Sequence, residues 1–564
     1  MAPRRGLLLY VGLLLAVLPW QGSATDNMPT DRSALIGLFP LTLIHTNDLH
    51  ARFDETSTTS GVCKASDQAA GLCIAGIARV YGTIKKLQSD YASLNPVYLN
   101  AGDNFQGSLW YTLLRGTVTA DLIKALPPKV MTLGNHEFDH SPKELGPYLR
   151  QLQNAGIRTV SSNILLNNEA NLMNLSITNS TYIMFGKKLF AVIGATYDNT
   201  HMEAVTGKVR FYNCTEGVLN EAIRLKARGV ERIIVLSHCG LDVDRLIAKA
   251  ADQYIDVIVG AHTHSFLFPP NSDRPRDPAD VIEDDYPVVV TGSTGRKILI
   301  TQAYAFGKYV GRLTVYFDYK GEVKYWEGYP IYMSNSVPQD PDTLARLAPW
   351  RAEVDRIGSQ KIGTTTILLS NSNCRLQECT VGSLIADSFA AYYTNATFRP
   401  LTFVHAGTFR ASIPVGDITN GQAINANPFG NTVDLIQLPG DAIRNCLEHA
   451  MVYDTSRRFN VMQVSGIRYT VNLSNPEYQR ITSVSVIDPA DGQYKPLDST
   501  KDYDVATLSF LMQGLNGFRW MLEGKNRQIG PLDSDLLVAY IGKLGEVNAG
   551  NLPGGRITIS GTAA

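Results

Sequence analysis

The chain has 564 residues, of which 44% are hydrophobic and 18% are charged, so it is long enough for two or three folded domains. Its formal net charge of −1 at pH 7 gives no electrostatic reason to bind a nucleic acid or a membrane surface. Seven cysteines in a chain of this length exclude a small scaffold held together mainly by disulfides.

The beginning of the chain predicts secretion. Two arginines precede an apolar run over residues 6–20, and small residues follow at 22–24, which is the pattern of a cleavable signal peptide over residues 1–24. No later segment is apolar for long enough to span a bilayer, and the last nine residues lack the hydrophobic tail of a GPI-anchor signal. We therefore expect an extracellular protein without a membrane anchor.

The cysteines and glycosylation sequons suit that compartment. Cys239 follows a histidine at a strand end, and we interpret it as a buried, inert thiol rather than a nucleophile or metal ligand. Short bridges are plausible for Cys63 with Cys73 and for Cys374 with Cys379, whereas Cys214, Cys239 and Cys446 leave at least one thiol unpaired. Sequons stand at Asn174, Asn179, Asn213, Asn395 and Asn472.

Buried strands alternate with helices over the first half of the chain. A helix is expected over residues 77–94, and the alternation predicts an α/β or sandwiched-sheet domain with its site in the loops after the strands. The apolar runs that predict strands are residues 41–44, 97–99, 130–133, 189–193, 233–236, 257–259, 288–291 and 311–318.

A helical connection is expected near residue 350. An apolar stripe marks residues 338–358, Pro349 interrupts it, and Gly358 is a good C-terminal cap. From residue 361 a second α/β domain begins. We therefore expect four parts: the signal peptide, a first domain over residues 25–337, a linker helix over 338–360 and a second domain over 361–564.

One strand end combines three chemically useful side chains. After the apolar run 130–133, Gly134 breaks the strand and the next turn presents Asn135, His136 and Asp139. These are an amide ligand, an imidazole, and a carboxylate that can hold the imidazole in one tautomer.

The same stretch contains the H-E-x-x-H pattern of zinc metalloproteases, from His136 to His140. The protease interpretation needs both histidines on one continuous helix. However, Ser141, Pro142 and Glu144 look like an N-cap, a first-turn proline and a capping-box glutamate. The helix is therefore expected to start after His140, which leaves the pattern in a loop.

Metal-binding side chains follow five of the predicted strands. Mixed carboxylate, imidazole and amide groups fit two borderline divalent ions better than a calcium cage, and a shared carboxylate such as Asp103 can bridge two metals that activate water for attack on phosphorus. Six of the ten histidines lie in these turns, namely His45, His50, His136, His238, His262 and His264.

The motifs in these turns resemble those of the metallophosphoesterases of the 5′-nucleotidase family. Within that family, the chain resembles the secreted salivary apyrases of blood-feeding insects. The resemblance implies an N-terminal metallophosphoesterase sandwich and a C-terminal α/β nucleotide-binding domain. The motifs are Thr46-Asn-Asp-Leu-His50, Gly102-Asp-Asn-Phe-Gln-Gly107, Gly134-Asn-His-Glu-Phe-Asp139, Ser237-His238 and Gly260-Ala-His-Thr-His264.

The resemblance also implies roles for individual residues. His136 would stabilise the transferring phosphoryl group, and Asp139 would orient His136. His264 stands where relatives often carry Asn or Gln. One divalent metal ion (Zn, Mn, Mg or Ca) would bind Asp48, His50, Asp103 and His264, and a second would bind Asp103, Asn135, His238 and His262.

In the second domain the resemblance implies a nucleotide site. Arginines would bind phosphate oxygens, two phenylalanine rings would sandwich the base, and two positions depart from the family pattern. The arginines are Arg52, Arg375 and Arg410, the rings are Phe429 and Phe510, and the departures are Asn516 in place of a ribose-binding Asp and His405 in place of an Asn near the base.

The expected function is that of a secreted apyrase that removes terminal phosphates from ATP and ADP and is antihaemostatic in saliva. A 5′-nucleotidase acting on AMP is the alternative with the same fold. The H-E-x-x-H protease and a nucleotide-binding protein without catalysis are alternatives from other classes. A nucleotide is the only expected partner, and the oligomeric state is left open.

Overall fold

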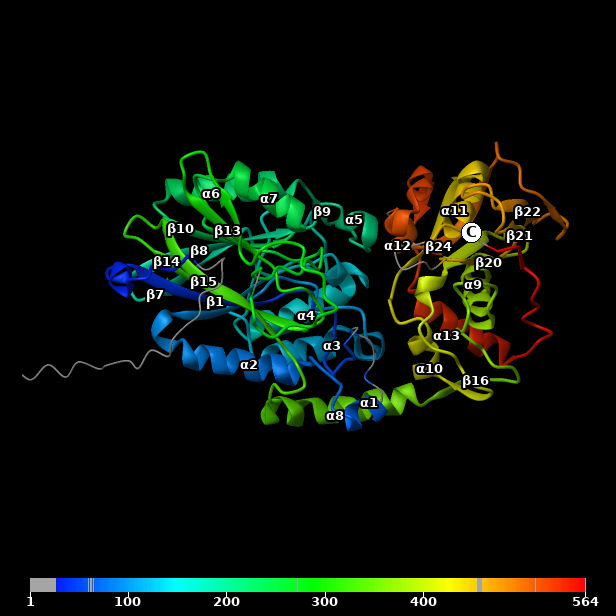
Figure 1. Ribbon diagram of the computed structural model, residues 1–564, viewed down its shortest axis with the longest axis horizontal. Helices are drawn as coiled ribbons and strands as arrows, with labels where there is room; N and C mark the ends of the chain where they lie inside the picture. The colour runs from blue at the N-terminus through cyan, green and yellow to red at the C-terminus, as the bar shows by residue number, and fades with distance from the viewer. Residues whose placement is uncertain are drawn as a thin grey trace, which may run out of the picture.

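The computed structural model describes residues 27–58, 60, 63, 65–270, 272–453, 459–512 and 514–562, so the expected signal peptide lies outside the described residues. Two groups of elements lie side by side and are joined by one long helix, α8 (Figure 1). Among the described residues, no helix combines the length and the apolar character needed to cross a membrane.

The first group contains two stacked mixed sheets. Each sheet has parallel central strands and antiparallel strands at an edge. In sheet order, the first consists of β15 (Val323–Tyr332), β14 (Tyr309–Phe317), β1 (Phe39–Thr46), β2 (Pro96–Asn100), β3 (Val130–Thr132), β4 (Arg158–Val160) and β6 (Ile177–Thr178). The second consists of β12 (Val288–Thr291), β13 (Lys297–Thr301), β11 (Val257–Val259), β10 (Arg232–His238), β8 (Lys188–Thr196) and β7 (Ser180–Phe185).

Both faces of the first sheet are buried, which explains its uninterrupted apolar runs. Leu41 and Leu43 on β1 face the second sheet and pack in one core cluster with residues such as Ile234 of β10. Ile44, between them and the turn, belongs to a second cluster on the opposite face. All eight strands expected from apolar runs are confirmed, each within a few residues of its predicted bounds.

Helices cover the outer faces of both sheets, which completes a four-layer sandwich (Figure 1). The helix expected over residues 77–94 is α2, although it ends at Asp90 and a short 3-10 turn follows. Beside the first sheet lie α2 (Ile77–Asp90), α3 (Leu109–Ala125) and α4 (Ser141–Asn154), and beside the second lie α6 (Cys214–Ala227) and α7 (Leu241–Ala250).

The connecting helix α8 (Pro341–Gly358) differs from expectation in two details. Pro349 lies inside a helix that continues past it, and Gly358 is the last helical residue rather than a left-handed cap. The helix begins after a polar N-cap, Asp340, whose carboxylate accepts from the Thr343 N–H. It packs on α2 and α3 of the first group and on α10 (Asn420–Ala426) of the second.

The second group is also α/β. Helices α9 (Thr380–Tyr393) and α11 (Gly440–Ala450) pack on a five-stranded sheet that lies between two core clusters, and α13 (Asp533–Leu544) packs on α9. In order, that sheet consists of β20 (Met462–Ser465), β17 (Leu401–His405), β24 (Asp502–Leu508), β19 (Val433–Pro439) and β25 (Lys525–Gln528). One smaller sheet consists of β18 (Gly416–Thr419), β16 (Lys361–Thr365) and β26 (Glu546–Val547). Another consists of β23 (Tyr494–Pro496), β22 (Ile481–Ile487), β21 (Ile467–Asn472) and β27 (Ile557–Ser560).

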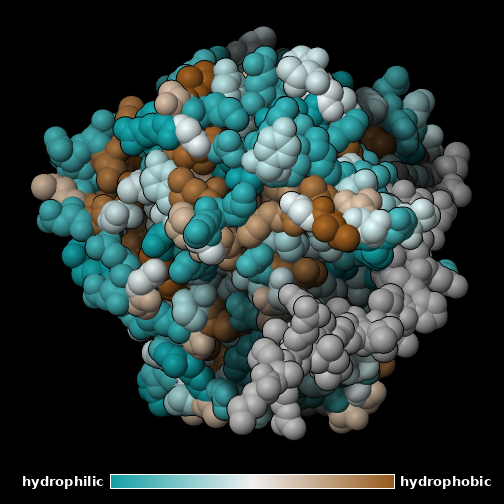
Figure 2. Space-filling model, turned by 90° about the vertical axis from the view of Figure 1, so that its left-hand side faces the viewer, coloured by the Kyte–Doolittle hydropathy of each residue, from teal (hydrophilic) through white to brown (hydrophobic). Residues whose placement is uncertain are grey.

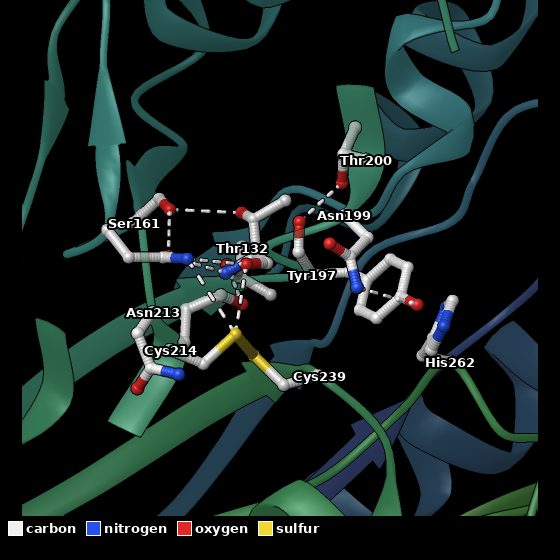
Figure 3. The surroundings of a disulfide bond; sticks show 12 residues. Thr132, Ser161, Tyr197, Asn199, Thr200, Asn213, Cys214, Cys239 and His262 are labelled. Atoms are coloured by element: carbon white, nitrogen blue, oxygen red, sulfur yellow. Dashed lines mark hydrogen bonds between the residues drawn. A yellow bond between two sulfur atoms is a disulfide. The ribbon is translucent and has the colours of Figure 1, made fainter. Parts of the chain in front are cut away.

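The cysteines give one confirmation and one correction. Both short bridges, Cys63–Cys73 and Cys374–Cys379, are formed. The expectation of a free Cys239 thiol is wrong, because Cys239 after β10 forms a disulfide with Cys214 at the start of α6 (Figure 3). The two positions are 25 residues apart, and only the packing of α6 beside the second sheet brings them together. Cys446 is buried and free.

The outer surface of the sandwich has no special apolar face in the view of Figure 2. Outside the grey atoms, apolar side chains form small separate patches among polar ones. Scattered patches of this kind are usual for a globular protein and require no partner.

Candidate active site

Polar side chains from both sheets meet at one edge of the sandwich. The carboxyl ends of parallel strands share an edge of their sheet, so the turns after them are neighbours. The turns after β1, β2, β3 and β11 carry Asp48 and His50, Asp103, Asn135 and His136, and His262 and His264. His238 is the last residue of β10.

A first group of donor atoms surrounds His50. Its Nε2 lies 3.0 Å from the Nε2 of His264 and 3.8 Å from the Oδ2 of Asp103. The Nε2 of His264 lies 3.5 Å from the Oδ1 of Asp48. A cation between them would stabilise this crowding of imidazole lone pairs and carboxylate oxygens.

A second group of donor atoms also meets the Oδ2 of Asp103. The Oδ2 of Asp103 lies 3.1 Å from the Nε2 of His238, and the Nδ1 of His262 lies 3.0 Å from the Oδ1 of Asn135. One donor atom each from Asp103, His238 and His262 falls within 4.8 Å of the others. Asp103 therefore belongs to both groups, as expected for a bridging carboxylate.

The orientation of His238 suits a metal ligand. Its Nδ1 donates to the carbonyl of Ala101 at 2.7 Å, which leaves the buried Nε2 without a well-aligned hydrogen bond. Burial lowers the pKa of His238, but Asp103 and Asp48 outweigh it and raise that pKa to about 10. Two buried carboxylates thus favour positive charge here, and the donor set fits a divalent metal ion.

His136, the predicted catalyst, and Asp139, the group predicted to orient it, form a pair beside these donor atoms. The Nδ1 of His136 lies 2.8 Å from the Oδ2 of Asp139, and 29% of the His136 side chain is exposed against 4% for Asp139. Burial raises the pKa of Asp139, although His136 acts against that shift. His136 also lies within ligand distance of His50 and Asp103, so its assignment as catalyst rather than ligand stays a prediction.

The H-E-x-x-H pattern does not form the helix of a metalloprotease. Residues His136–Phe138 make a 3-10 turn, and α4 starts at Ser141. His140 points elsewhere, with its ring stacked on Tyr111 and hydrogen-bonded to Arg115.

The expected capping box is wrong in detail. His140 is the N-cap of α4 and makes no side-chain capping bond. The carboxylate of Glu144 accepts from the Gly116 N–H of α3 at 3.0 Å, because α3 packs closely against α4 at this point.

One histidine of the strand ends lies outside the site. His45 is the last but one residue of β1, and its Nε2 lies 2.9 Å from the hydroxyl of Tyr286. Its ring occupies the space beside Gly311, where a Cβ would come within 2.1 Å of it. Burial lowers the pKa of His45 to about 3, so it is a neutral structural residue.

Three residues at the site were not singled out from the sequence. Tyr197 follows β8, a sixth strand of this edge, and stacks on His262 with ring centroids 4.2 Å apart (Figure 3). Phe306 contacts the rings of both His50 and His264. Glu137 lies beneath the two turns that carry Asp103 and Asn135. Only Glu137, inside a quoted motif, had a sequence signal.

Arg52 lies at the rim of the donor groups. Its Nε donates to the Ser60 carbonyl at 3.1 Å, and its guanidinium is 5.2 Å from the centre of the Phe306 ring. Burial lowers the pKa of Arg52 to about 10, and no carboxylate among the described residues forms an ion pair with it. A partly buried cation of this kind suits a phosphate group.

The residues of the second domain that were predicted to bind the nucleotide fall into two clusters. In one, the rings of His405 and Phe510 are stacked 5.2 Å apart. A Cβ on Gly407 would lie 3.1 Å from the His405 ring and 3.4 Å from the Arg375 guanidinium, so Arg375 is adjacent. Burial and Arg375 lower the pKa of His405 to about 4.

The second cluster is more open. The Arg410 guanidinium lies 5.5 Å from the centre of the Phe429 ring, and both side chains are exposed. Asn516 lies nearer the first cluster, in a 3-10 turn (Leu515–Gly517) that contacts the helix of Phe510. It is exposed, with φ of 53°, and its carbonyl accepts from His449 Nε2 at 2.9 Å. Hydrogen bonding to His449 thus fixes the backbone of Asn516.

The two halves of the site touch through the turn after β2. A Cβ on Gly430, next to Phe429, would lie 2.6 Å from the Nε2 of Gln106. Arg115 of α3 also forms an ion pair of 3.0 Å with Asp535 of α13. The loop that carries Phe429 therefore lies beside the motif that carries Asp103.

Comparisons with known proteins agree with this architecture. The family description "Calcineurin-like phosphoesterase" matches residues 41–266, and "5'-nucleotidase, C-terminal domain" matches residues 361–523. An apyrase of Aedes aegypti is 50% identical over 562 residues, which is 99% of each chain. An apyrase of Aedes albopictus is 51% identical over 555 residues, which is 97% of each chain.

A solved structure supports the same assignment. The 5′-nucleotidase precursor from Thermus thermophilus is 31% identical, with a TM-score of 0.64 over 93% of this chain and 99% of that chain. The two-part fold, the convergent metal-binding groups and these full-length matches lead to one conclusion: the chain belongs to the 5′-nucleotidase family of metallophosphoesterases and is a metal-dependent nucleotide phosphohydrolase.

Proposed function

We propose that the protein is a secreted apyrase that removes the terminal phosphate of ATP and of ADP at a two-metal site. The observation that carries the proposal is the sharing of Asp103 between two donor groups beside the His136–Asp139 pair. The name of the two Aedes relatives supports the choice among nucleotide phosphohydrolases. Secretion rests on the N-terminal sequence pattern and on the bridged cysteines.

Seven side chains would hold two divalent metal ions. When bound, such ions supply Lewis acidity and make a coordinated water more acidic. The first ion would be held by Asp48, His50, Asp103 and His264, and the second by Asp103, Asn135, His238 and His262. The buried Nε2 of His238 without a well-aligned hydrogen bond supports this fit.

His136 would act on the phosphoryl group directly. Its Nδ1 lies 2.8 Å from the Oδ2 of Asp139, so Nε2 would face the phosphoryl group. Nε2 carries a proton together with Nδ1 only in the doubly protonated imidazolium, and in that form His136 would donate the proton to a phosphoryl oxygen. Asp139 is almost fully buried, and its carboxylate would accept from Nδ1–H and hold the ring in this orientation. Arg52 would bind an oxygen of the same phosphate, since none of the described carboxylates forms an ion pair with it.

The second domain would bind the rest of the nucleotide. Arg375 and Arg410 would contact further phosphates, and the rings of Phe429 and Phe510 would stack on the base. Asn516 keeps hydrogen bonding to a ribose but lacks the charge of an aspartate acceptor. AMP has no further phosphate for the arginines and depends most on that weakened contact. We therefore expect ATP to be converted through ADP to AMP, with AMP accumulating.

Product analysis tests the proposal. Phosphate release from ATP, ADP and AMP is measured with and without a chelator, and the nucleotides are separated by chromatography. We expect chelator-sensitive conversion of ATP and ADP and little adenosine. Rapid conversion of AMP to adenosine would identify a 5′-nucleotidase instead, the activity named for the Thermus thermophilus relative. Chelator-resistant hydrolysis would contradict the two-metal site.

A further inference from the structure

One buried carboxylate joins the two turns at the centre of the site. Glu137 is fully buried, and its side chain accepts hydrogen bonds from three backbone N–H groups. The Oε2 atom accepts from Asp103 at 3.0 Å and from Gly134 at 2.7 Å. The Oε1 atom accepts from the backbone of Asn104 at 2.7 Å and from its side-chain amide at 3.2 Å.

The turn that carries Asp103 needs such support. Asp103 has a φ of 52° and follows Gly102 with a φ of 90°, so a non-glycine residue is held in the left-handed region. This conformation turns the N–H groups of Asp103 and Asn104 toward the same carboxylate. Acceptor groups in such a concavity of N–H groups favour the left-handed conformation over extended alternatives.

The second turn is pressed against the first. A Cβ on Gly134 would lie 1.9 Å from the Oδ1 of Asp103, so no larger residue fits there. The same Oδ1 accepts from the His136 N–H at 3.0 Å, while Oδ2 faces His238 and His50. The direction of the Asp103 carboxylate thus depends on the relative position of the two turns.

We propose that Glu137 is a positioning residue that clamps the 102–104 turn to the 134–136 turn, so that Asp103, Asn135 and His136 keep the relative positions that metal binding and phosphoryl transfer require. The inference rests on the proposed two-metal site, but it concerns a residue outside both proposed donor groups. Glu137 acts through the backbone of its neighbours.

Glu137→Gln is the most informative variant. The amide has nearly the same shape but only one acceptor oxygen, so its NH₂ group would face one or two N–H donors. Loss of partners that orient metal ligands typically lowers metal affinity or activity ~10–100-fold. We expect this variant to bind Mn²⁺ and Zn²⁺ more weakly, as measured by equilibrium dialysis and elemental analysis. Its kcat should be lower at limiting metal concentration and should recover in part at high metal concentration. The KM for ATP should be unchanged. Glu137→Asp should fall between Glu137→Gln and the unchanged protein.

The chain offers a matched control in the second domain. Glu448 is also buried, and its carboxylate accepts from the N–H groups of Arg480 at 2.8 Å and of Ile481 at 3.1 Å. With chelator present, we expect both Glu137→Gln and Glu448→Gln to lower the melting temperature. Glu448→Gln should nevertheless leave the metal affinity unchanged.

The outcomes separate this inference from the proposed function. Glu137→Gln with unchanged metal affinity and kcat would overturn the positioning role while the metal site stood. An equal loss of metal affinity in Glu448→Gln would mean that the loss in Glu137→Gln comes from general destabilisation. That result would also overturn the positioning role of Glu137. If the unchanged protein neither binds these ions nor needs them for hydrolysis, the proposed function itself fails.

Discussion

The two halves of the site differ in how firmly the fold holds them. In the first domain, the donor side chains are mostly buried, come from two sheets, and contact one another at 3.0–3.8 Å. In the second domain, Arg410, Phe429 and Asn516 are exposed. The difference indicates where each property of the enzyme is encoded. We expect the chemistry to depend on the crowded edge of the sandwich, and nucleotide preference to depend on a more open surface that can change without disturbing the donor groups.

Asp103→Asn gives the sharpest test of the crowded half. The shared carboxylate would lose the charge that both donor groups use, so both metal ions should be lost. We expect activity to fall by more than the ~10²–10⁴-fold contributed by an acid–base group. Metal content by elemental analysis checks the cause. Retention of both ions would mean that Asp103 does not bridge them.

His136→Ala comes next in size. If His136 is the catalyst and not a ligand, kcat should fall ~10²–10⁴-fold while metal content stays near that of the unchanged protein. His201 is an exposed histidine of the same domain, and His201→Ala provides a matched control that should leave kcat unaltered. A lost metal ion in His136→Ala would place His136 among the ligands and revise the first donor group.

Phe429→Ala tests the open half. The ring is 40% exposed, and removing a base-stacking contact costs roughly 1–3 kcal/mol, so KM for ATP should rise while kcat changes little. Tyr392, also in the second domain and 55% exposed, is the matched aromatic control. An unchanged KM together with a lower kcat would mean that the second domain contributes to the chemistry rather than to binding.

The smallest effect is expected for His140→Ala. This side chain contacts Tyr111 and Arg115 and none of the metal-binding groups, so nucleotide hydrolysis and metal content should both survive, with at most a modest loss of thermal stability. Steady-state kinetics and elemental analysis check this result. Loss of metal in this variant would contradict the loop assignment and favour the H-E-x-x-H alternative.

Much of the fold was accessible from local sequence. The apolar runs of β1, β2, β3, β8, β10 and β11 are buried on both faces and therefore stand out as short hydrophobic segments. The glycine at position 134 and the turn residues after it correctly indicated where strand β3 ends and its polar turn begins. The start of α4 was also predicted correctly, although the capping groups were not, because Glu144 bonds to a neighbouring helix instead.

The sequence by itself determined the strands, the turns that follow them and the types of donor they carry, because periodicity and turn chemistry act over a few residues. Only the tertiary structure decided which donors meet. His45 and His50 come from the same strand end, yet His45 bonds to Tyr286 and His50 faces His264. Cys214 pairs with Cys239, and Glu137 joins two turns. These contacts depend on the sheet order and on helix packing, which bring together residues far apart in the chain and have no local signature.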